Sequence, residues 1–210
     1  MSLNHFRLIC WDFDGVIKDS VDVKTEAFVE LFQEYGQDIA EKVRAHHLAN
    51  CGMSRFEKLP LYCRWSGREA DCKDIENLCE RFSSLALQRV IDSPWVSGVE
   101  RLLRNNPYNQ KFALVSATPQ EEIDRIVKML DLTECFVDVF GAPVPKRIAI
   151  RKSLDKCAIN PEHCLMIGDA RADLEAAEDN EVAFLLRLHA ANLHVFDGYE
   201  GMVIEDFSNL

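Results

Sequence analysis

Short apolar segments alternate with helical segments over most of this 210-residue chain, and this alternation restricts the possible fold more than any other feature. Strands are expected at 8–11, 111–115, 136–140, 164–167 and 182–186, with an edge strand at 202–204. Helical periodicity lies between them, for example over 146–157 and 171–178. Strands that alternate with helices form right-handed crossovers. The sequence therefore predicts an α/β fold with a Rossmann-like, mostly parallel sheet flanked by helices on both faces.

One long stretch after the first expected strand contains no strand signal. Its apolar residues recur at spacings of three and four, which indicates amphipathic helices. Glycines divide it into four expected helices, at 21–35, 37–49, 54–64 and 69–91. We therefore predict two domains. The α/β core comprises 1–16 and 94–210, and an inserted all-helical cap domain comprises 17–93.

Charge and cysteine usage restrict the class of protein. Lys and Arg number 24 against 35 Asp and Glu, a net charge of −11, so no cationic surface for nucleic acid or an anionic membrane is expected. The eight cysteines show no C-x-x-C pair, which favours free thiols in a reducing compartment. No apolar run approaches 18 residues and no signal peptide is recognisable. We expect a soluble, cytoplasmic protein.

Two aspartates follow the first expected strand, in Asp12-Phe13-Asp14-Gly15. Residues two apart on a strand point to the same side, so these carboxylates can converge where the strand ends. Adjacent carboxylates repel unless a cation lies between them, and Mg²⁺ prefers such oxygen ligands. One carboxylate could attack phosphorus while the other transfers a proton. The alternative is a surface turn whose aspartates bond to nearby amides.

A hydroxyl and a cation follow two other expected strands. Ser116, with the backbone amide of Ala117, lies at a strand end before a helix, where amides favour anions. Thr118 is expected to cap that helix. Lys146 begins a helix after a loop with two prolines, although a lysine opposes the helix dipole there, and this indicates a bound anion. The alternatives are an ordinary helix-entry serine and a solvent-exposed lysine.

Two more carboxylates follow the strand expected at 164–167. Asp169 lies at the strand end and Asp173 lies one helical turn further on, so both can face one ion. Aspartates are also common at helix starts, which is the alternative explanation. Because all four motifs follow strands, they map to one edge of one sheet, where open α/β sheets bind ligands. Together they predict a metal site beside a phosphate-binding site.

These four motifs, in this order, resemble those of the haloacid dehalogenase superfamily, in its helical-cap phosphatase branch of phosphoglycolate phosphatase-like and β-phosphoglucomutase-like members. The resemblance extends from residue 8 to about residue 187. It implies that Asp12 is the nucleophile that forms an aspartyl-phosphate. Asp14 would act as general acid and then as general base. Dehalogenases of the superfamily lack this second aspartate, so Asp14 favours a phosphate ester as substrate.

The resemblance also implies a set of ligands. Ser116, the amide of Ala117 and Lys146 would hold the phosphoryl oxygens. Mg²⁺ would be bound by Asp12, the backbone carbonyl of Asp14 and Asp169, with Asp173 as a direct or indirect ligand. These groups would neutralise charge on the phosphoryl oxygens and keep the nucleophile in line.

Specificity is expected to come from the cap. The segment Gly52-Met53-Ser54-Arg55 resembles the cap loop that reaches the active site in phosphoglucomutase-like members. The resemblance implies that Arg55 holds a second anionic group of the substrate, with Lys58 behind it. The alternative is a solvated arginine at a helix start. Arg171, where a smaller residue is common in the family, could touch phosphate, lock the cap or cover the edge of the site.

A zinc site is the competing interpretation for the cap. His46 and His47 lie near Cys51 and Cys63 in the sequence. Adjacent histidines on a helix diverge by roughly 100°, and the set lacks a tight pair of ligands. We therefore do not expect zinc to bind here.

The sequence thus predicts an enzyme, a Mg²⁺-dependent phosphatase that acts on a small phosphorylated metabolite such as a sugar phosphate or a phosphoglycolate-like acid. A β-phosphoglucomutase-like phosphosugar mutase would use the same chemistry and differ in excluding water. A non-catalytic phospho-ligand-binding domain is the alternative outside enzymes. We expect no nucleic-acid or membrane partner, and a monomer or homodimer.

Overall fold

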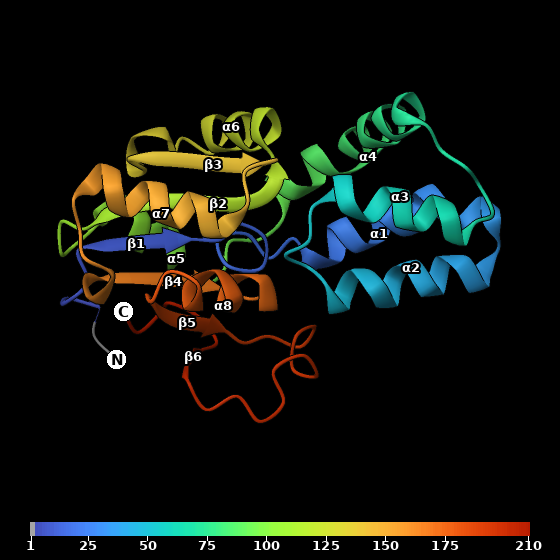
Figure 1. Ribbon diagram of the computed structural model, residues 1–210. Coiled ribbons are helices and arrows are strands. Elements are labelled where there is room, and N and C mark those ends of the chain that lie inside the picture. The colour runs from blue at the N-terminus through green and yellow to red at the C-terminus, as the bar shows by residue number, and fades with distance from the viewer. Residues whose placement is uncertain (1–2) are drawn as a thin grey trace.

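The computed structural model describes residues 3–210, in which a parallel sheet covered by helices lies beside a group of four helices (Figure 1). The strands are β1 (Leu8–Trp11), β2 (Lys111–Pro119), β3 (Asp138–Ala142), β4 (Cys164–Gly168), β5 (Ala183–Arg187) and β6 (Met202–Ile204). Their order across the sheet is β3-β2-β1-β4-β5-β6, and every pairing is parallel. The chain therefore winds outwards in both directions from β1, and the order reverses between β1 and β4. The predicted α/β fold is confirmed.

Helices cover both faces of the sheet because successive strand side chains point to opposite sides. Ile9 and Trp11 of β1 belong to the core formed with α5 (Val99–Asn105) and α6 (Gln120–Met129). Leu8 and Cys10 belong to a second core formed with α7 (Lys146–Cys157) and α8 (Arg171–Glu178). The short helix α5 was not among the elements expected from the sequence.

Two expected boundaries differ from the structure on the α6 side of the sheet. Strand β3 lies two residues later than the segment predicted at 136–140, since Ala142 still pairs with Pro119 of β2. Thr118 was expected to cap α6, and this is wrong. Strand β2 continues through Pro119, α6 begins at Gln120, and the Thr118 hydroxyl bonds to other partners described below.

The four helices that follow β1 are α1 (Val21–Phe32), α2 (Gln37–Ala49), α3 (Arg55–Trp65) and α4 (Cys72–Asp92). They lie to the right of the sheet in Figure 1, beyond its carboxyl end. Phe28, Phe32, Tyr62 and Phe82 form the centre of their packing, and this cluster continues into the core between the sheet and helices α5 and α6. The four predicted helices are therefore present, whereas the exact limits of the cap domain remain our prediction.

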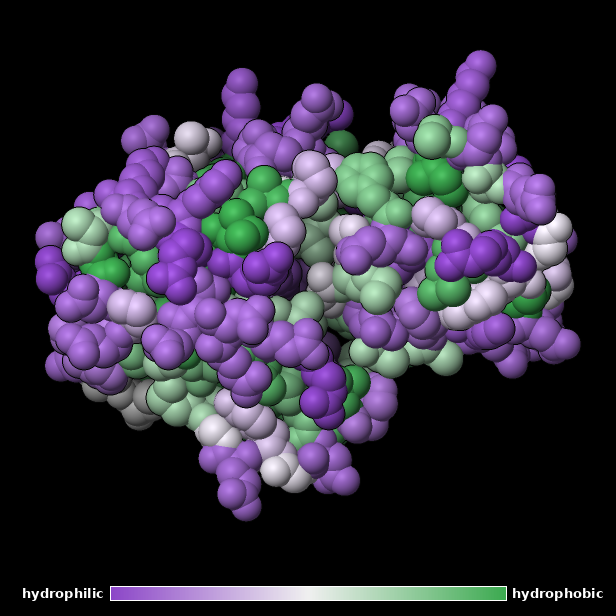
Figure 2. Space-filling model, viewed as in Figure 1, coloured by the Kyte–Doolittle hydropathy of each residue, from purple (hydrophilic) through white to green (hydrophobic). Residues whose placement is uncertain are grey.

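The surface shows where the two parts meet. Hydrophilic residues cover most of the visible face of both, and the molecule narrows to a waist between them (Figure 2). No helix within residues 3–210 is both long enough and apolar enough to cross a membrane.

Candidate active site

The first motif lies at the point where the strand order reverses. The Asp12 amide donates to the carbonyl of Ile167 at 2.9 Å, which extends the pairing of β1 with β4 by one residue. Gly15 then turns the chain with a φ of +76°, and a Cβ there would lie 2.1 Å from Oδ2 of Asp169. The turn therefore requires glycine for both its conformation and its close approach to Asp169. This local geometry brings the loop after β1 against the loop after β4.

A lysine joins the motifs. Lys146 is the first residue of α7, and its Nζ lies 3.0 Å from Oδ1 of Asp12 and 2.6 Å from Oδ1 of Asp173. The other carboxylate oxygen of Asp173 accepts from the Ala170 amide at the start of α8. Asp12, Lys146, Asp169 and Asp173 are all buried. We refer to these four residues as the acidic cluster.

Burial and like charge disfavour the ionised carboxylates of the acidic cluster. Burial raises the pKa of Asp12 to about 7, with a further contribution from the charge of Asp173. Burial also raises the pKa values of Asp169 and Asp173. Burial opposes the charge of Lys146 too, but Asp12 and Asp173 together raise the pKa of its ammonium above the usual value. Three carboxylates thus share one ammonium, which leaves an excess of negative charge.

The acidic cluster fits a divalent cation. Carboxylate oxygens of Asp12, Asp169 and Asp173 all lie within 4.8 Å of one another, and within residues 3–210 they form the one such group of three potential ligands. Oδ1 of Asp169 is buried and has no hydrogen-bond partner. An unpaired buried carboxylate oxygen is costly, and a hard cation would satisfy it.

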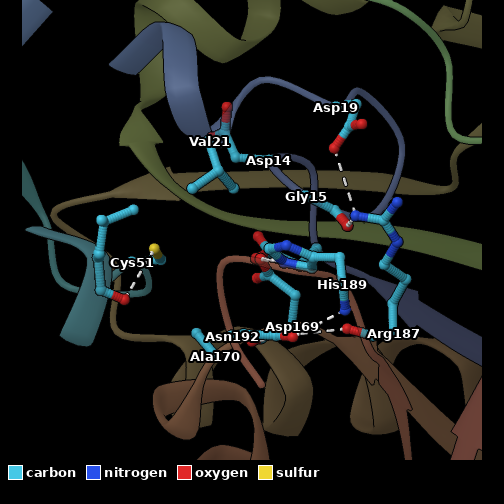
Figure 3. Close-up of polar contacts among 12 residues, drawn as sticks. Asp14, Gly15, Asp19, Val21, Cys51, Asp169, Ala170, Arg187, His189 and Asn192 are labelled. Carbon is cyan, nitrogen blue, oxygen red and sulfur yellow. Dashed lines mark hydrogen bonds and ion pairs between the residues drawn. The ribbon is translucent and has the colours of Figure 1, made fainter. Parts of the chain in front are cut away.

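Residues after β5 hold Asp169 in place. Nε2 of His189 lies 2.9 Å from Oδ2 of Asp169, and the Asn192 side chain donates to the backbone carbonyl of Asp169 at 2.8 Å (Figure 3). One carboxylate oxygen is therefore fixed by the protein while the other stays available to a ligand. In Figure 3 His189 lies between Asp169 and the Asp14–Gly15 turn.

Asp14 has a different environment from Asp12, because it contacts the cap helices. Nζ of Lys24, on α1, lies 2.5 Å from Oδ2 of Asp14. Ser20 donates to Oδ1 at 2.7 Å and Thr118 donates to Oδ2 at 3.2 Å. Burial alone would raise the pKa of Asp14, but Lys24 and these hydroxyls lower it. Asp14 is therefore held as a carboxylate in this arrangement.

The expected phosphate-binding residues lie at the end of β2. Ser116 is buried, and its Oγ accepts from the amide of Thr118 at 3.1 Å. Ala117 lines a cavity of about 30 Å³ between the sheet edge and the cap, together with Asp14 and Thr118. Lys24 also bonds to the Thr118 hydroxyl at 2.8 Å. The hydroxyl that was expected to cap a helix thus connects the cap domain to the carboxyl edge of the sheet.

The structure places Arg55 in a buried ion pair. Arg55 begins α3, and its guanidinium donates to both carboxylate oxygens of Glu122 on α6, at 2.9 and 2.5 Å. It also donates to the Ser83 hydroxyl of α4 at 2.7 Å. Burial would raise the pKa of Glu122, but Arg55 holds it below its usual value. Arg55 therefore joins the cap to the core, and its charge is already balanced.

The remaining candidates are bound to polar partners of the protein itself. Arg171 donates to the carbonyl of Val195 at 2.7 Å, within the segment that follows β5. Nδ1 of His46 lies 3.0 Å from the Tyr62 hydroxyl, and Nδ1 of His47 lies 2.8 Å from Nζ of Lys58. Both histidines thus have polar partners of their own.

Sequence reasoning missed several residues of the site. Lys24 occupies the apolar face of α1, three and four residues before Ala27 and Phe28, and a cation on such a face is a recognisable signal. His189 follows β5, which reaches the same edge of the sheet as the other motifs. Glu122 carries no local signal, because only the docking of the cap brings it to Arg55.

Comparisons with known proteins agree with this geometry. The model of the haloacid dehalogenase-like hydrolase family matches residues 6–180. A phosphorylated carbohydrates phosphatase from Thermotoga maritima is 27% identical over 184 residues, which cover 81% of this chain and 79% of that protein. A phosphoglycolate phosphatase from Aliivibrio fischeri is 24% identical over 182 residues, which cover 82% of this chain and 79% of that protein.

A solved structure shares the fold. The β-phosphoglucomutase from Clostridium difficile superposes with a TM-score of 0.73 at 21% identity, over 98% of this chain and 93% of that one. At this identity the likeness concerns the fold alone. Because the family match covers most of the chain, the protein belongs to the haloacid dehalogenase-like hydrolases, and the predictions of that superfamily, of its phosphatase branch and of an enzyme are confirmed.

Proposed function

We propose that the protein is a Mg²⁺-dependent phosphatase that hydrolyses a small phosphorylated metabolite through an aspartyl-phosphate on Asp12. The observation that supports this most strongly is the acidic cluster, in which Lys146 bridges Asp12 and Asp173 beside an unpaired oxygen of Asp169. The names of the two curated relatives favour a sugar phosphate or a phosphoglycolate-like acid as substrate.

The metal would be held by Asp12, Asp169 and Asp173, with the backbone carbonyl of Asp14. When bound, Mg²⁺ would offset the repulsion between the anionic nucleophile and the anionic ester. Lys146, the Ser116 hydroxyl and the Ala117 amide would bind the phosphoryl oxygens. Ser116 and Ala117 lie in the carboxyl-terminal part of β2, and Lys146 begins the helix that follows β3, which supports this assignment.

The reaction proceeds in two transfers. A carboxylate oxygen of Asp12 attacks phosphorus, the bond from phosphorus to the ester oxygen breaks, and protonated Asp14 gives its proton to that oxygen to release an alcohol. Water then attacks phosphorus, Asp14 takes a proton from it, and phosphate leaves with Asp12 restored. Lys24 holds Asp14 ionised in this structure. The ionised form suits the second transfer, in which Asp14 accepts a proton from water. The first transfer requires Asp14 to carry a proton.

Release of inorganic phosphate tests the proposal. We expect hydrolysis of an aryl phosphate and of members of a panel of phosphorylated metabolites, dependent on Mg²⁺ and abolished by EDTA. Asp12→Asn is expected to reduce kcat by at least about 10⁴-fold, as loss of a covalent nucleophile does. Asp155→Asn, at an exposed position of α7, is the matched control. Full activity of Asp12→Asn would contradict the proposal. Failure to hydrolyse any ester or to bind beryllofluoride would favour a non-catalytic phospho-ligand-binding domain.

A phosphosugar mutase is the second candidate, because the cap is closed over the site. A Cβ at Gly52 would lie 2.8 Å from Cβ of Ala172 in α8, and Lys24 of α1 contacts Asp14 directly. A closed cap that excludes water would let the phosphoryl group pass to a second hydroxyl of a sugar. Incubation with a sugar 1-phosphate distinguishes the two, since a mutase yields the 6-phosphate and a phosphatase yields free phosphate.

The location of the protein and its assembly follow from the same interpretation. We propose a cytoplasmic enzyme, a monomer or homodimer, whose partner is the phosphorylated metabolite. Size-exclusion chromatography with light scattering measures the assembly directly.

A further inference from the structure

The small cavity between cap and core is lined by more positive than negative charge. We call it the cap pocket, and its lining includes Asp14, Lys24, His47, Arg55 and Lys58. Two of its three cations are balanced within the chain. Lys24 contacts Asp14, and Arg55 forms two hydrogen bonds with Glu122. Lys58 forms no ion pair with any carboxylate of residues 3–210.

Lys58 is nevertheless one of the most deeply buried side chains of the protein. It is 1% exposed, and its recorded polar partner is His47, whose Nδ1 lies 2.8 Å from Nζ. The ring of Phe28 adds a weak cation–π contact, with its centroid 5.6 Å from Nζ. Buried lysines are almost always paired with an anion, because an uncompensated ammonium is costly to remove from water.

The surroundings of Lys58 show how incompletely its charge is compensated. Burial lowers the pKa of its ammonium to about 7. Burial and the neighbouring Lys58 charge hold the pKa of His47 well below its ordinary value, so His47 accepts a hydrogen bond as a neutral ring. His47 thereby orients Nζ and leaves its other two protons for a ligand. An anion from outside the chain would supply the missing partner.

The position of Lys58 indicates which part of a ligand would reach it. The cap pocket has Asp14, Ala117 and Thr118 on its core side and His47 and Lys58 on its cap side. Asp14 is the proposed acid for the leaving oxygen, so the substrate portion beyond that oxygen would extend into this pocket. Apolar walls from Phe28 and Phe82 make the pocket narrow.

We propose that Lys58, oriented by His47, binds a second anionic group of the substrate, a carboxylate or a phosphate carried on its leaving-group side. This rests on the proposed phosphatase function and specifies its substrate class as small dianionic or polyanionic phosphate esters. Arg55, the residue first expected to hold such a group, forms an ion pair with Glu122 that joins the cap to α6.

Matched pairs of esters test the assignment. Phosphoglycolate is compared with 2-hydroxyethyl phosphate, in which a hydroxymethyl group replaces the carboxylate, and propane-1,3-diol bisphosphate with 3-hydroxypropyl phosphate. We expect the wild-type protein to prefer the anionic ester of at least one pair over its neutral partner. For that anionic ester, Lys58→Met should lower kcat/KM by about 10- to 100-fold, because the loss of one charge-assisted hydrogen bond has an effect of this size. The neutral partner should change by no more than about twofold. The two pairs separate a carboxylate ligand from a phosphate ligand.

Direct binding separates failure of this inference from failure of the proposed function. In the Asp12→Asn background, calorimetry measures the affinity of both members of each pair without turnover. Lys58→Met and Lys58→Gln should each abolish the preference for the anionic ester, whereas Lys73→Met, an exposed lysine of α4, should retain it. Circular dichroism confirms that each variant is folded.

Two results would overturn the assignment. One is an equal change for anionic and neutral esters in both Lys58 variants. The other is loss of the preference in Arg55→Met while Lys58→Met retains it. If wild type hydrolyses no ester but its preference in binding depends on Lys58, the subsite is real and the phosphatase function is wrong.

Discussion

The acidic cluster and the cap pocket both bury charge, but of opposite sign. The acidic cluster has an excess of negative charge, and the cap pocket has an excess of positive charge. In the acidic cluster three carboxylates share the ammonium of Lys146. The cap pocket is lined by three cations and one carboxylate, Asp14, and a second carboxylate, Glu122, lies behind the lining as the partner of Arg55. Because buried charge is stable only when it is balanced, the core side requires a cation and the cap side requires an anion. A metal bound with an anionic phosphate ester supplies both.

Among the substitutions that test this comparison, the largest effect is expected at Lys146. Lys146→Met removes the sole ammonium of the cluster and a proposed ligand of the phosphoryl oxygens. We expect kcat to fall by about 10²- to 10³-fold, as when one donor to a developing negative charge is lost. Phosphate release under saturating Mg²⁺ measures this, with Lys152→Met on the exposed side of α7 as control. A loss of less than fivefold would mean that Lys146 is a structural counter-ion only.

The Arg55–Glu122 pair should act on cap docking rather than on substrate charge. Glu122→Gln leaves Arg55 buried with a neutral partner, which should cost roughly 3 kcal/mol of stability in the closed form. We expect KM to rise for anionic and neutral esters alike. Glu121→Gln, at the exposed neighbouring position, should change neither KM nor Tm. A KM increase confined to anionic esters would show that Arg55 binds the second anionic group of the substrate. The assignment of that group to Lys58 would then be wrong.

The pH dependence of stability should report the uncompensated charge of Lys58. Its pKa is about 7 in the folded protein and near 10.5 when unfolded, so the folded protein releases this proton first. The charged ammonium therefore opposes folding most strongly below pH 7, and this penalty declines as pH rises towards 10.5. Lys58→Met should raise Tm by several degrees near pH 6, at about 2–4 °C per kcal/mol.

That gain should shrink progressively between pH 7 and pH 10. Lys73→Met should give no such pH-dependent difference. A gain in Tm that stays constant across this range would show that Lys58 is already compensated within the free protein, and the cap pocket would then not require an external anion.

The smallest effect is expected at the contact between the two regions. Gly52→Ala places a methyl group 2.8 Å from Cβ of Ala172 and 3.1 Å from Cβ of Ala170, so the cap must shift by a few tenths of an ångström. We expect KM to rise by about two- to fivefold with little change in kcat. The double variant Gly52→Ala/Ala172→Gly should recover most of the wild-type KM. Failure of that recovery would show that the cap does not close by this contact.

The contrast between the regions also explains what could be predicted from the sequence. Asp12 and Asp169 directly follow expected strands, and Lys146 and Asp173 lie in the first turns of the helices that come after such strands. Parallel strands bring their carboxyl ends to one edge. Their assembly therefore follows from local patterns and topology alone. The Asp14–Lys24 and Arg55–Glu122 pairs depend on how the cap docks on the core, which no local pattern specifies.

Thr118 shows the same limit at a smaller scale. Its spacing from Pro119 and Glu121 matches a capping box, but strand β2 continues to Pro119 because it still pairs with Ala142 of β3. The hydroxyl is then free to bond with Asp14 and Lys24. A tertiary pairing thus overrides a local helix signal and gives the residue a place in the site.

Detection of a phosphoryl group on Asp12 tests the central claim most directly. Wild-type protein is mixed with Mg²⁺ and a hydrolysed ester, quenched in acid, reduced with borohydride and digested for peptide mass spectrometry. The account predicts that the residue at position 12 is converted to homoserine in a substrate- and Mg²⁺-dependent manner, and that Asp14 is unchanged. Rapid phosphate release with Asp12 unmodified at every time point would contradict it.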